Sequence, residues 1–142
     1  MIRKTILQKN ATWIDDTRNV LTRLKGMGYT VQRPVHARKT GQRVFGSSFH
    51  NPEEKRIFIE KVKGKKGTPV VNLIHEGSHA FTYKGEKPIS IFTAMKNPEL
   101  KKQKIQSEIN AHREALKNIK TPELRKQYLD VARENMKGYK AL

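Results

Sequence analysis

The sequence predicts an α+β fold in which an N-terminal helix precedes a small, twisted three-stranded sheet and three helices complete the chain. Three observations lead to this prediction: an amphipathic run near the N-terminus, β-rich runs in the middle, and three proline-marked helix starts in the second half. The order helix, small sheet, helices is typical of the α+β class. A length of 142 residues suits one domain, spanning 1–142.

The first helix is expected over residues 12–27, TWIDDTRNVLTRLKGM. Thr12 and Asp15 resemble a capping box, in which side chains at both ends of the first turn bond backbone N–H groups that lack a helical partner. Gly26 and Gly28 provide the stop, because glycine readily adopts the left-handed conformation that ends helices.

Three strands are expected next, over residues 29–35, 43–49 and 55–62, where aromatic and β-branched residues concentrate. The residues NPEE at 51–54 lie between the second and third strands, and their turn-forming composition predicts a hairpin that pairs these strands. The segment KGKKG at 63–67 is then a basic connection to the second half of the chain.

The remaining helices are expected at about 69–83, 98–119 and 122–137. Each begins with a Thr-Pro or Asn-Pro pair, in which the polar side chain caps the helix and proline occupies its first position. Glu99 and Glu123 follow within the first turns of the last two helices, where they meet the positive end of the helix dipole.

The composition restricts the classes of function. The chain has no cysteine, which excludes disulfides and thiolate zinc sites, so a metal ion would need His, Asp or Glu ligands. Its formal net charge of +17 favours anionic partners such as nucleic acid, an acidic protein or an anionic membrane surface. No segment is apolar enough for a signal peptide or a transmembrane span, so we expect a cytoplasmic protein.

The stretch NLIHEGSHAFTY, residues 72–83, contains the pattern His-Glu-x-x-His. On a helix, residues four apart differ by roughly 40° in direction and about 6 Å in height, so the imidazoles of His75 and His79 can reach one point beside the helix. Zn²⁺ accepts such nitrogens at about 2.0–2.1 Å in a tetrahedral site. Glu76 follows the first ligand, where its carboxylate can act as general base on a water. Gly77 is unfavourable in a helix and suggests that another backbone or a substrate passes close by.

The helix expected at 98–119 offers two candidates for a third metal ligand. Its isoleucine and leucine residues form an inward stripe with His112 in the middle, and Glu108 lies one turn earlier. Ala111 and Ala115 flank this region, and their small side chains allow a neighbouring helix to approach closely. Either Glu108 binds zinc and His112 supports it, or His112 binds and Glu108 orients a ligand imidazole. A carboxylate leaves the site with one net positive charge, which a bound hydroxide would neutralise, and this favours Glu108.

The segment HEGSHA, followed by a helix that bears a glutamate, resembles the zincin metallopeptidases, specifically the compact gluzincin-like enzymes of phages and bacteria. The resemblance is firm over 69–83 and loose over 43–119. It implies a zincin-like minimal fold, two His ligands and the general base on one helix, and a third ligand on a later helix, where it points to Glu108. It also implies an extended peptide substrate along a strand edge, for which residues 55–62 are the candidate. Thermolysin-type gluzincins carry an aspartate four residues after the ligand glutamate, whereas this chain has His112, which could instead donate to the oxyanion.

Taken together, these residues predict a zinc-dependent endopeptidase that acts on peptide or protein substrates. Zn²⁺ held by His75, His79 and Glu108 would activate a water, and Glu76 would carry its proton to the leaving amine. Tyr83 is a candidate for stabilising the transition state. The sequence does not choose between it and the other candidates, which are Asn72, Arg113, Tyr128 and Tyr139.

Two other functions fit the same residues. The chain could be a basic nucleic-acid-binding or regulatory protein whose zinc site has no peptidase activity, and its net charge supports this alternative. It could also be a zinc hydrolase that acts on a non-peptide amide, such as a cell-wall bond. His36 and His50 have no partner at ligand spacing, and we expect neither to take part in the site.

Overall fold

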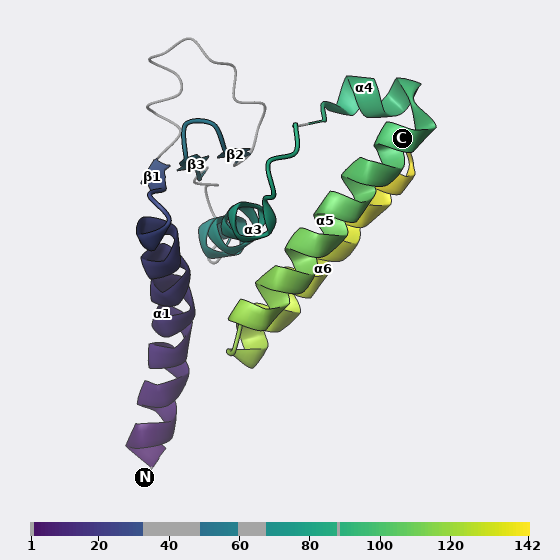
Figure 1. Cartoon of the computed structure of the whole chain (residues 1–142). Coiled ribbons are helices and arrows are strands. Elements are labelled where there is room, and N and C mark those ends of the chain that lie inside the picture. The colour runs from purple at the N-terminus through teal and green to yellow at the C-terminus, as the bar shows by residue number, and fades with distance from the viewer. Residues whose placement is uncertain (1, 33–48, 60–67, 88) are drawn as a thin grey trace.

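Figure 1 shows the computed structural model of the chain, in which the described residues are 2–32, 49–59, 68–87 and 89–142. These residues form helices and a small mixed sheet, so the predicted α+β class is confirmed. In chain order the elements are α1 (Ile2–Gly26), β1 (Thr30–Gln32), β2 (Phe49–Asn51), β3 (Arg56–Phe58), α3 (Thr68–Thr82), α4 (Ile91–Lys96), α5 (Pro98–Asn118) and α6 (Pro122–Lys140).

The first helix ends where the sequence predicts but begins earlier. α1 starts at Ile2 and not at Thr12, since no proline or glycine interrupts the preceding residues. It stops at Gly26, and Gly28 adopts a left-handed φ of 84°, which turns the chain into β1. The capping-box start at Thr12 and Asp15 is therefore wrong, because both residues lie inside the helix.

The sheet has the strand order β1-β3-β2. β2 and β3 pair antiparallel around the predicted NPEE turn, in which the Asn51 side-chain oxygen accepts a hydrogen bond from the Glu54 N–H at 3.1 Å. β1 runs parallel to β3. β3 is therefore the central strand, and the expected substrate edge at 55–62 is wrong for its described part, because β1 and β2 occupy both of its sides.

Part of the strand region lies outside the described residues. This holds for 33–48 and 60–67, which include the ends of the expected strands, His36 and the basic connection at 63–67. Each described strand has three residues, and only β3 can be compared with its prediction: it ends at Phe58, earlier than expected.

The HExxH motif lies on α3, which begins at Thr68, within one residue of the predicted start. Figure 1 shows α3 between α1 on one side and the α5–α6 pair on the other. A β-carbon at Gly77 would lie 2.9 Å from Val20 Cγ1 and 3.4 Å from Leu24 Cδ1, both on α1. The close neighbour that Gly77 predicts is thus a pair of α1 side chains, and neither a backbone nor a substrate is needed to explain the glycine.

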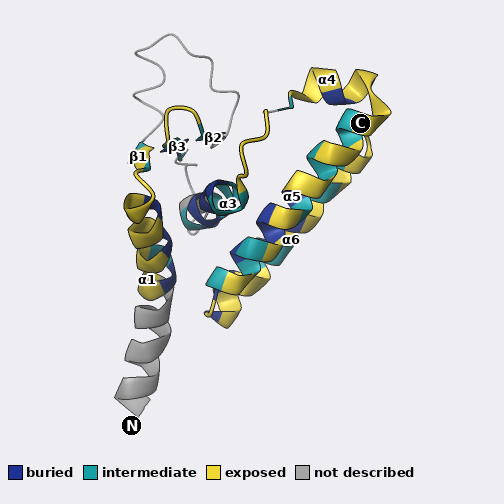
Figure 2. Cartoon of the chain, viewed as in Figure 1, coloured by how far each residue is buried: buried dark blue, intermediate teal, exposed yellow. Residues whose placement is uncertain are grey.

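The face of α5 that packs against α3 is not centred on the predicted isoleucine and leucine stripe. Ala111 and Ala115 are fully buried, and Glu108 and His112 are buried beside them. The expected isoleucine and leucine stripe is only half-buried, except at its last residue, Ile119. The two alanines allow the close approach that the sequence predicts, and this approach brings Glu108 against the motif helix. Figure 2 shows the buried faces of α1, α3 and α5 turned toward one another.

The helix starts differ in how they are capped. Asn97 caps α5 as predicted, since its side-chain oxygen accepts from the Glu99 and Leu100 N–H groups at 3.0 and 3.3 Å. Thr121 precedes α6, but its hydroxyl donates to Asp16 of α1 and does not cap the helix. The short helix α4 was not expected from the sequence, although Ser90 caps it and accepts from the Thr93 N–H at 3.1 Å. None of the described helices is both long and apolar enough to cross a membrane.

Candidate metal centre

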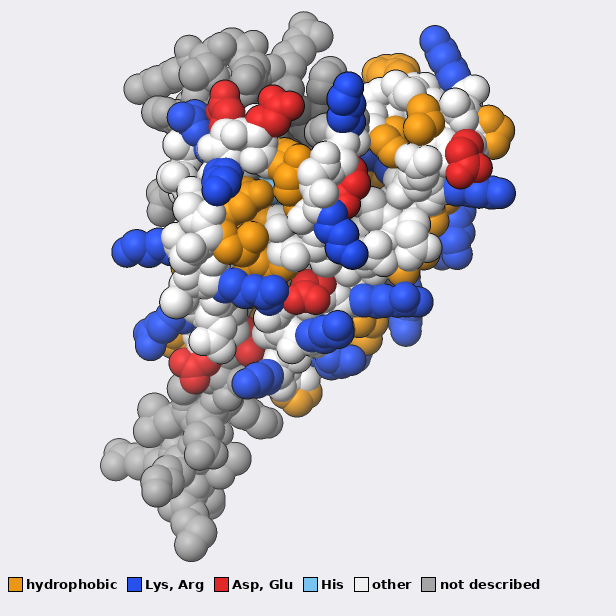
Figure 3. Space-filling model, in the orientation of Figure 1, with side chains coloured by type: hydrophobic (Ala, Val, Ile, Leu, Met, Phe, Trp, Pro, Cys, Tyr) orange, Lys and Arg blue, Asp and Glu red, His pale blue; other side chains and the backbone are white. Residues whose placement is uncertain are grey.

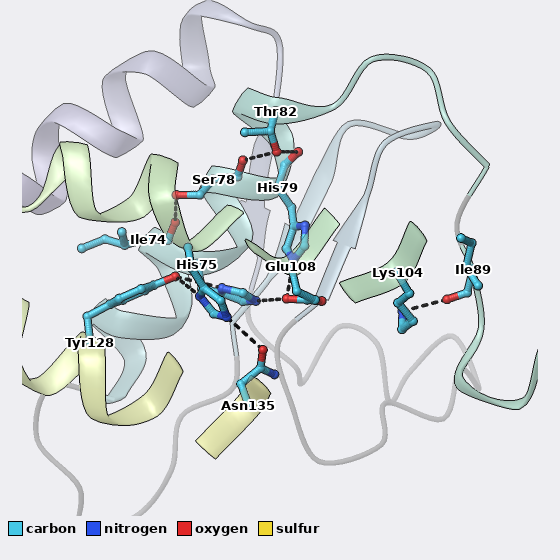
Figure 4. A network of polar contacts seen from close by, with 11 residues as sticks. Ile74, His75, Ser78, His79, Thr82, Ile89, Lys104, Glu108, Tyr128 and Asn135 are labelled. Carbon is cyan, nitrogen blue, oxygen red and sulfur yellow. Dashed lines mark hydrogen bonds and ion pairs between the residues drawn. The ribbon is translucent and has the colours of Figure 1, made fainter. Parts of the chain in front are cut away.

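Three predicted ligands meet at one point between α3 and α5. The Nε2 atoms of His75 and His79 each lie 3.2 Å from the same oxygen, Oε2 of Glu108. The two imidazoles come from successive turns of α3, and their ring centres are 4.7 Å apart. Figure 4 shows both rings turned toward the Glu108 carboxylate. The structure therefore brings together the three side chains that the sequence favours as metal ligands.

The two nitrogen–oxygen separations have the length of hydrogen bonds and also the length expected between two ligands of a tetrahedral zinc ion. Two ligand atoms at about 2.05 Å from a zinc ion, with a tetrahedral angle between them, are about 3.3 Å apart. The two nitrogen–oxygen distances of 3.2 Å match this value. About 16% of the side-chain surface of His75 and 17% of that of His79 remain exposed, so both imidazoles keep a small contact with solvent.

Among the described residues, the group of donor atoms that lie close enough together to hold a metal ion contains His112 and not His79. The donor atoms of its members, His75, Glu108 and His112, all lie within 4.8 Å of one another. Both ring nitrogens of His112 already have partners, however: Nδ1 lies 2.8 Å from the Tyr128 hydroxyl and Nε2 lies 3.0 Å from Oδ1 of Asn135. These contacts favour His112 as a support for the site and leave His79 as the freer imidazole.

Tyr128 joins the two histidines that face each other across α3 and α5. Its hydroxyl lies 3.0 Å from Nδ1 of His75 and 2.8 Å from Nδ1 of His112. It comes from α6, and its buried ring packs in the core. A metal-binding histidine commonly donates its second N–H to such a partner, which sets both the tautomer and the direction of the ring. Tyr128 was only one of several aromatic candidates in the sequence, and Asn135 was missed.

The directions of these hydrogen bonds determine which ring nitrogen of His75 carries a hydrogen. Oδ1 of Asn135 can only accept, so His112 donates from Nε2. Burial, followed by the nearby charge of His75, lowers the pKa of His112, which is therefore neutral and accepts at Nδ1 from Tyr128. The Tyr128 oxygen in turn accepts from Nδ1 of His75. The Nε2 atom of a neutral His75 then carries a lone pair. This lone pair points at the Glu108 carboxylate unless a proton or a metal ion lies between the two atoms.

The electrostatics of the centre pair the Glu108 carboxylate with the two imidazoles. Burial alone would raise the pKa of Glu108, but the hydrogen bonds with His75 and His79 outweigh it, and the pKa is lowered far below its usual range. Burial alone would lower the pKa of His75, but the hydrogen bond to Glu108 and the charge of Glu76 outweigh it and raise the pKa. Glu108 thus stays ionised in a buried position, where an unpaired charge would be costly.

Glu76 lies next to the centre without being part of the ligand group. Burial raises the pKa of its carboxyl, whereas the charges of His75 and His79 act to lower it. Lys104 of α5 also lowers the pKa of Glu76. A carboxylate with a raised pKa beside the ligands is suited to accept and return a proton.

Tyr139 of α6 completes the surroundings of the carboxylate. Burial, followed by the charge of Glu108, raises the pKa of its phenol, so Tyr139 lies near enough to the carboxylate to feel its charge. The sequence suggested Tyr139 only as one of several candidates, since its position late in α6 does not reveal which face of the centre it reaches.

The other candidates lie on the sheet side of α3. His50 on β2 bonds through Nε2 to the Tyr29 hydroxyl at 2.8 Å, and burial, followed by the charge of His79, lowers its pKa to about 4. Tyr83 stacks edge-on against His50, with ring centres 6.0 Å apart, and is partly exposed. The contacts of Tyr83 thus lead to β2, and it is not drawn into the Glu108 group.

Comparison with known proteins does not assign the site. The chain matches no protein-family model, no curated protein and no solved structure. The function of the centre must therefore be inferred from its own residues and distances.

Proposed function

We propose that the protein is a zinc-dependent metallopeptidase, with zinc held by His75, His79 and Glu108 and with Glu76 as general base. The observation that carries this proposal is the meeting of two imidazole nitrogens on one carboxylate oxygen at 3.2 Å each. Two neutral nitrogens and one carboxylate are a ligand set that zinc accepts, and three protein ligands are typical of catalytic zinc sites. The resemblance of HEGSHA to the gluzincin-like enzymes supports the same assignment.

The residues around the ion have distinct tasks in this proposal. When bound, zinc would supply a water of lowered pKa and would polarise the carbonyl of the scissile bond. Glu76 accepts the proton of the attacking water and delivers it to the leaving nitrogen, a role that its raised pKa supports. Tyr128 holds the Nδ1 proton of His75 and so directs Nε2 of that ring toward the ion.

The first test combines metal content and peptide hydrolysis. The purified full-length chain should bind one zinc ion and should cleave an unfolded, fluorescently labelled protein. Glu76→Gln should retain the zinc and lower the rate of cleavage about 10²- to 10⁴-fold, because general acid–base catalysis contributes about that much. Glu123→Gln changes an exposed carboxylate at the start of α6 and is the matched control.

Three results would contradict the proposal. The first is a wild-type protein that binds zinc but cleaves no peptide bond in a broad set of unfolded proteins. The second is a Glu76→Gln variant with normal activity. The third is a protein that binds no zinc at neutral pH.

A further inference from the structure

The short helix α4 exposes a compact apolar surface. Phe92, Met95 and Ile91 are 77%, 57% and 49% exposed, and we call these three side chains the α4 patch. They lie within an arc of about 100° on the helix. Ala94, on the other side, is 1% exposed and anchors α4 against α5. Figure 3 shows hydrophobic side chains gathered over α4 at the upper right of the molecule.

Exposed lysines lie near the α4 patch along the chain, on both sides of it. Those exposed on α4, on the segment before it and on the start of α5 are Lys84, Lys87, Lys96 and Lys102. The exposed carboxylates in this region are Glu86 and Glu99, and Glu86 accepts from the Lys84 backbone N–H at 3.1 Å. This part of the chain is therefore net positive, and a ligand that covers the patch should carry both apolar and acidic groups.

α4 is joined to the metal centre through Lys104. The ammonium group of Lys104 donates to the Ile89 carbonyl at 2.7 Å, just before α4, and lies 5.4 Å from the centre of the Tyr139 ring. Lys104 is one turn before Glu108 on α5, and its charge acts on Glu76. Figure 4 shows this contact beside the ligand group.

The distance between the α4 patch and the centre suits one polypeptide. α4 packs at the start of α5, and the ten residues from Pro98 to Glu108 span about 15 Å of helix. An extended chain covers that distance with about five residues. A polypeptide bound at the centre can therefore reach the α4 patch with a neighbouring segment.

We propose that the α4 patch is a docking site for the polypeptide substrate, and that it selects segments with apolar and acidic side chains. The inference rests on the proposed peptidase function and names the class of substrate. Apolar side chains of the substrate cover Phe92 and Met95, and its carboxylates pair with these exposed lysines. The scissile bond then lies several residues away from the docked segment.

Binding to a peptide that cannot be cut tests this proposal directly. The probe is a fluorescein-labelled 15-residue peptide of Glu, Leu and Gly, added to the zinc-loaded Glu76→Gln protein and followed by fluorescence anisotropy. The double substitution Phe92→Ser and Met95→Ser should raise the Kd about tenfold, and added salt should weaken binding, because exposed charges are screened. Ile14→Ser on α1 removes an apolar side chain that is 54% exposed on another helix, and it should leave the Kd unchanged.

Three outcomes would overturn the docking site: a wild-type surface that does not bind the peptide, an unchanged Kd in the double variant, or equal affinity for a peptide with Lys in place of Glu. Binding of phosphatidylglycerol vesicles that depends on Phe92 and Met95, without binding of the acidic peptide, would overturn it as well and would assign the patch to an anionic membrane. Circular dichroism of the double variant checks that the fold is retained.

A kinetic arm separates this proposal from the proposed function. The double variant should lose about tenfold in kcat/KM on an unfolded acidic protein and should cleave a tetrapeptide at the wild-type rate. If no form of the protein cleaves either substrate, the peptidase function fails, while the anisotropy measurement still reports on docking.

Discussion

Two buried carboxylates, Asp16 on α1 and Glu108 on α5, have different kinds of partners. Oδ2 of Asp16 accepts from the backbone N–H groups of Lys120 and Thr121 and from the Thr121 hydroxyl, at 3.0–3.1 Å. Oε2 of Glu108 faces two imidazole nitrogens. The exposed fractions are 0% for Asp16 and 6% for Glu108, so burial alone does not distinguish them.

The partners distinguish a structural acid from a functional one. Backbone N–H groups and a hydroxyl carry their own hydrogens, and Asp16 therefore ties α1 to the start of α6 without any added ligand. An imidazole nitrogen faces a carboxylate favourably only with a proton or a metal ion between them. The contacts of Asp16 thus need no added ion, whereas those of Glu108 need a proton or a metal ion on the imidazole side.

The largest expected effect is that of Glu108→Gln on zinc affinity. The substitution keeps the shape and removes the negative ligand, and we expect the affinity to fall about a thousandfold, since loss of an outer partner alone costs about 10- to 100-fold. Competition with a chromophoric chelator measures this. The metal-free variant should unfold in urea within about 1 kcal/mol of the wild type, because the glutamine amide can donate to a neutral imidazole nitrogen in place of the carboxylate contact. If Glu108→Gln bound zinc with wild-type affinity, Glu108 would not be a metal ligand and would not differ from Asp16 in this respect.

Asp16→Ala should lower the stability of the fold and leave zinc affinity nearly unchanged. It leaves three donors, two of them buried, without their acceptor, and we expect the free energy of unfolding of the metal-free protein to fall by about 3 kcal/mol. Zinc affinity should stay within about threefold of the wild type, because α1 supplies no ligand. Asp15→Ala changes the exposed neighbour and should alter stability by no more than about 0.5 kcal/mol. A large loss of zinc affinity in Asp16→Ala would show that the two regions are coupled.

Tyr128→Phe should weaken zinc binding without removing a ligand. The hydroxyl that orients His75 is lost and the buried ring remains, so we expect a 10- to 100-fold loss of affinity, about the cost of an outer partner. Tyr29→Phe removes a hydroxyl that bonds His50 and is the control, with affinity within about threefold of the wild type. Equal losses in both variants would argue against a specific role for Tyr128.

The smallest expected effect is that of Gly77→Ala, which probes the contact between the two regions. The new β-carbon would push against Val20 and Leu24, and we expect a net loss of about 1 kcal/mol after the gain in helix propensity is counted. Urea unfolding measures this loss, and zinc affinity should change little. A stabilised variant would show that α1 adjusts freely against α3.

Local signals in the sequence were sufficient for many elements. The Asn-Pro pair marked the start of α5, the NPEE segment marked the hairpin, and Gly28 marked the end of α1, because each depends on residues that are neighbours in the chain. Predictions from local sequence were wrong where a contact with a distant residue replaced the local one. Thr121 has the composition of a cap, but Asp16, distant in sequence, takes its hydroxyl.

The sequence by itself determined the α+β class and the helix that carries His75, Glu76 and His79, and it named Glu108 and His112 on α5 as the candidates for a third ligand. It could do so because helical spacing relates residues three or four apart. Only the tertiary structure decided how α5 is rotated against α3, so that Glu108 meets both imidazoles while His112 is held by Tyr128 and Asn135. That rotation depends on how closely two alanines let the helices approach and on what α6 places behind them, and no local pattern encodes it.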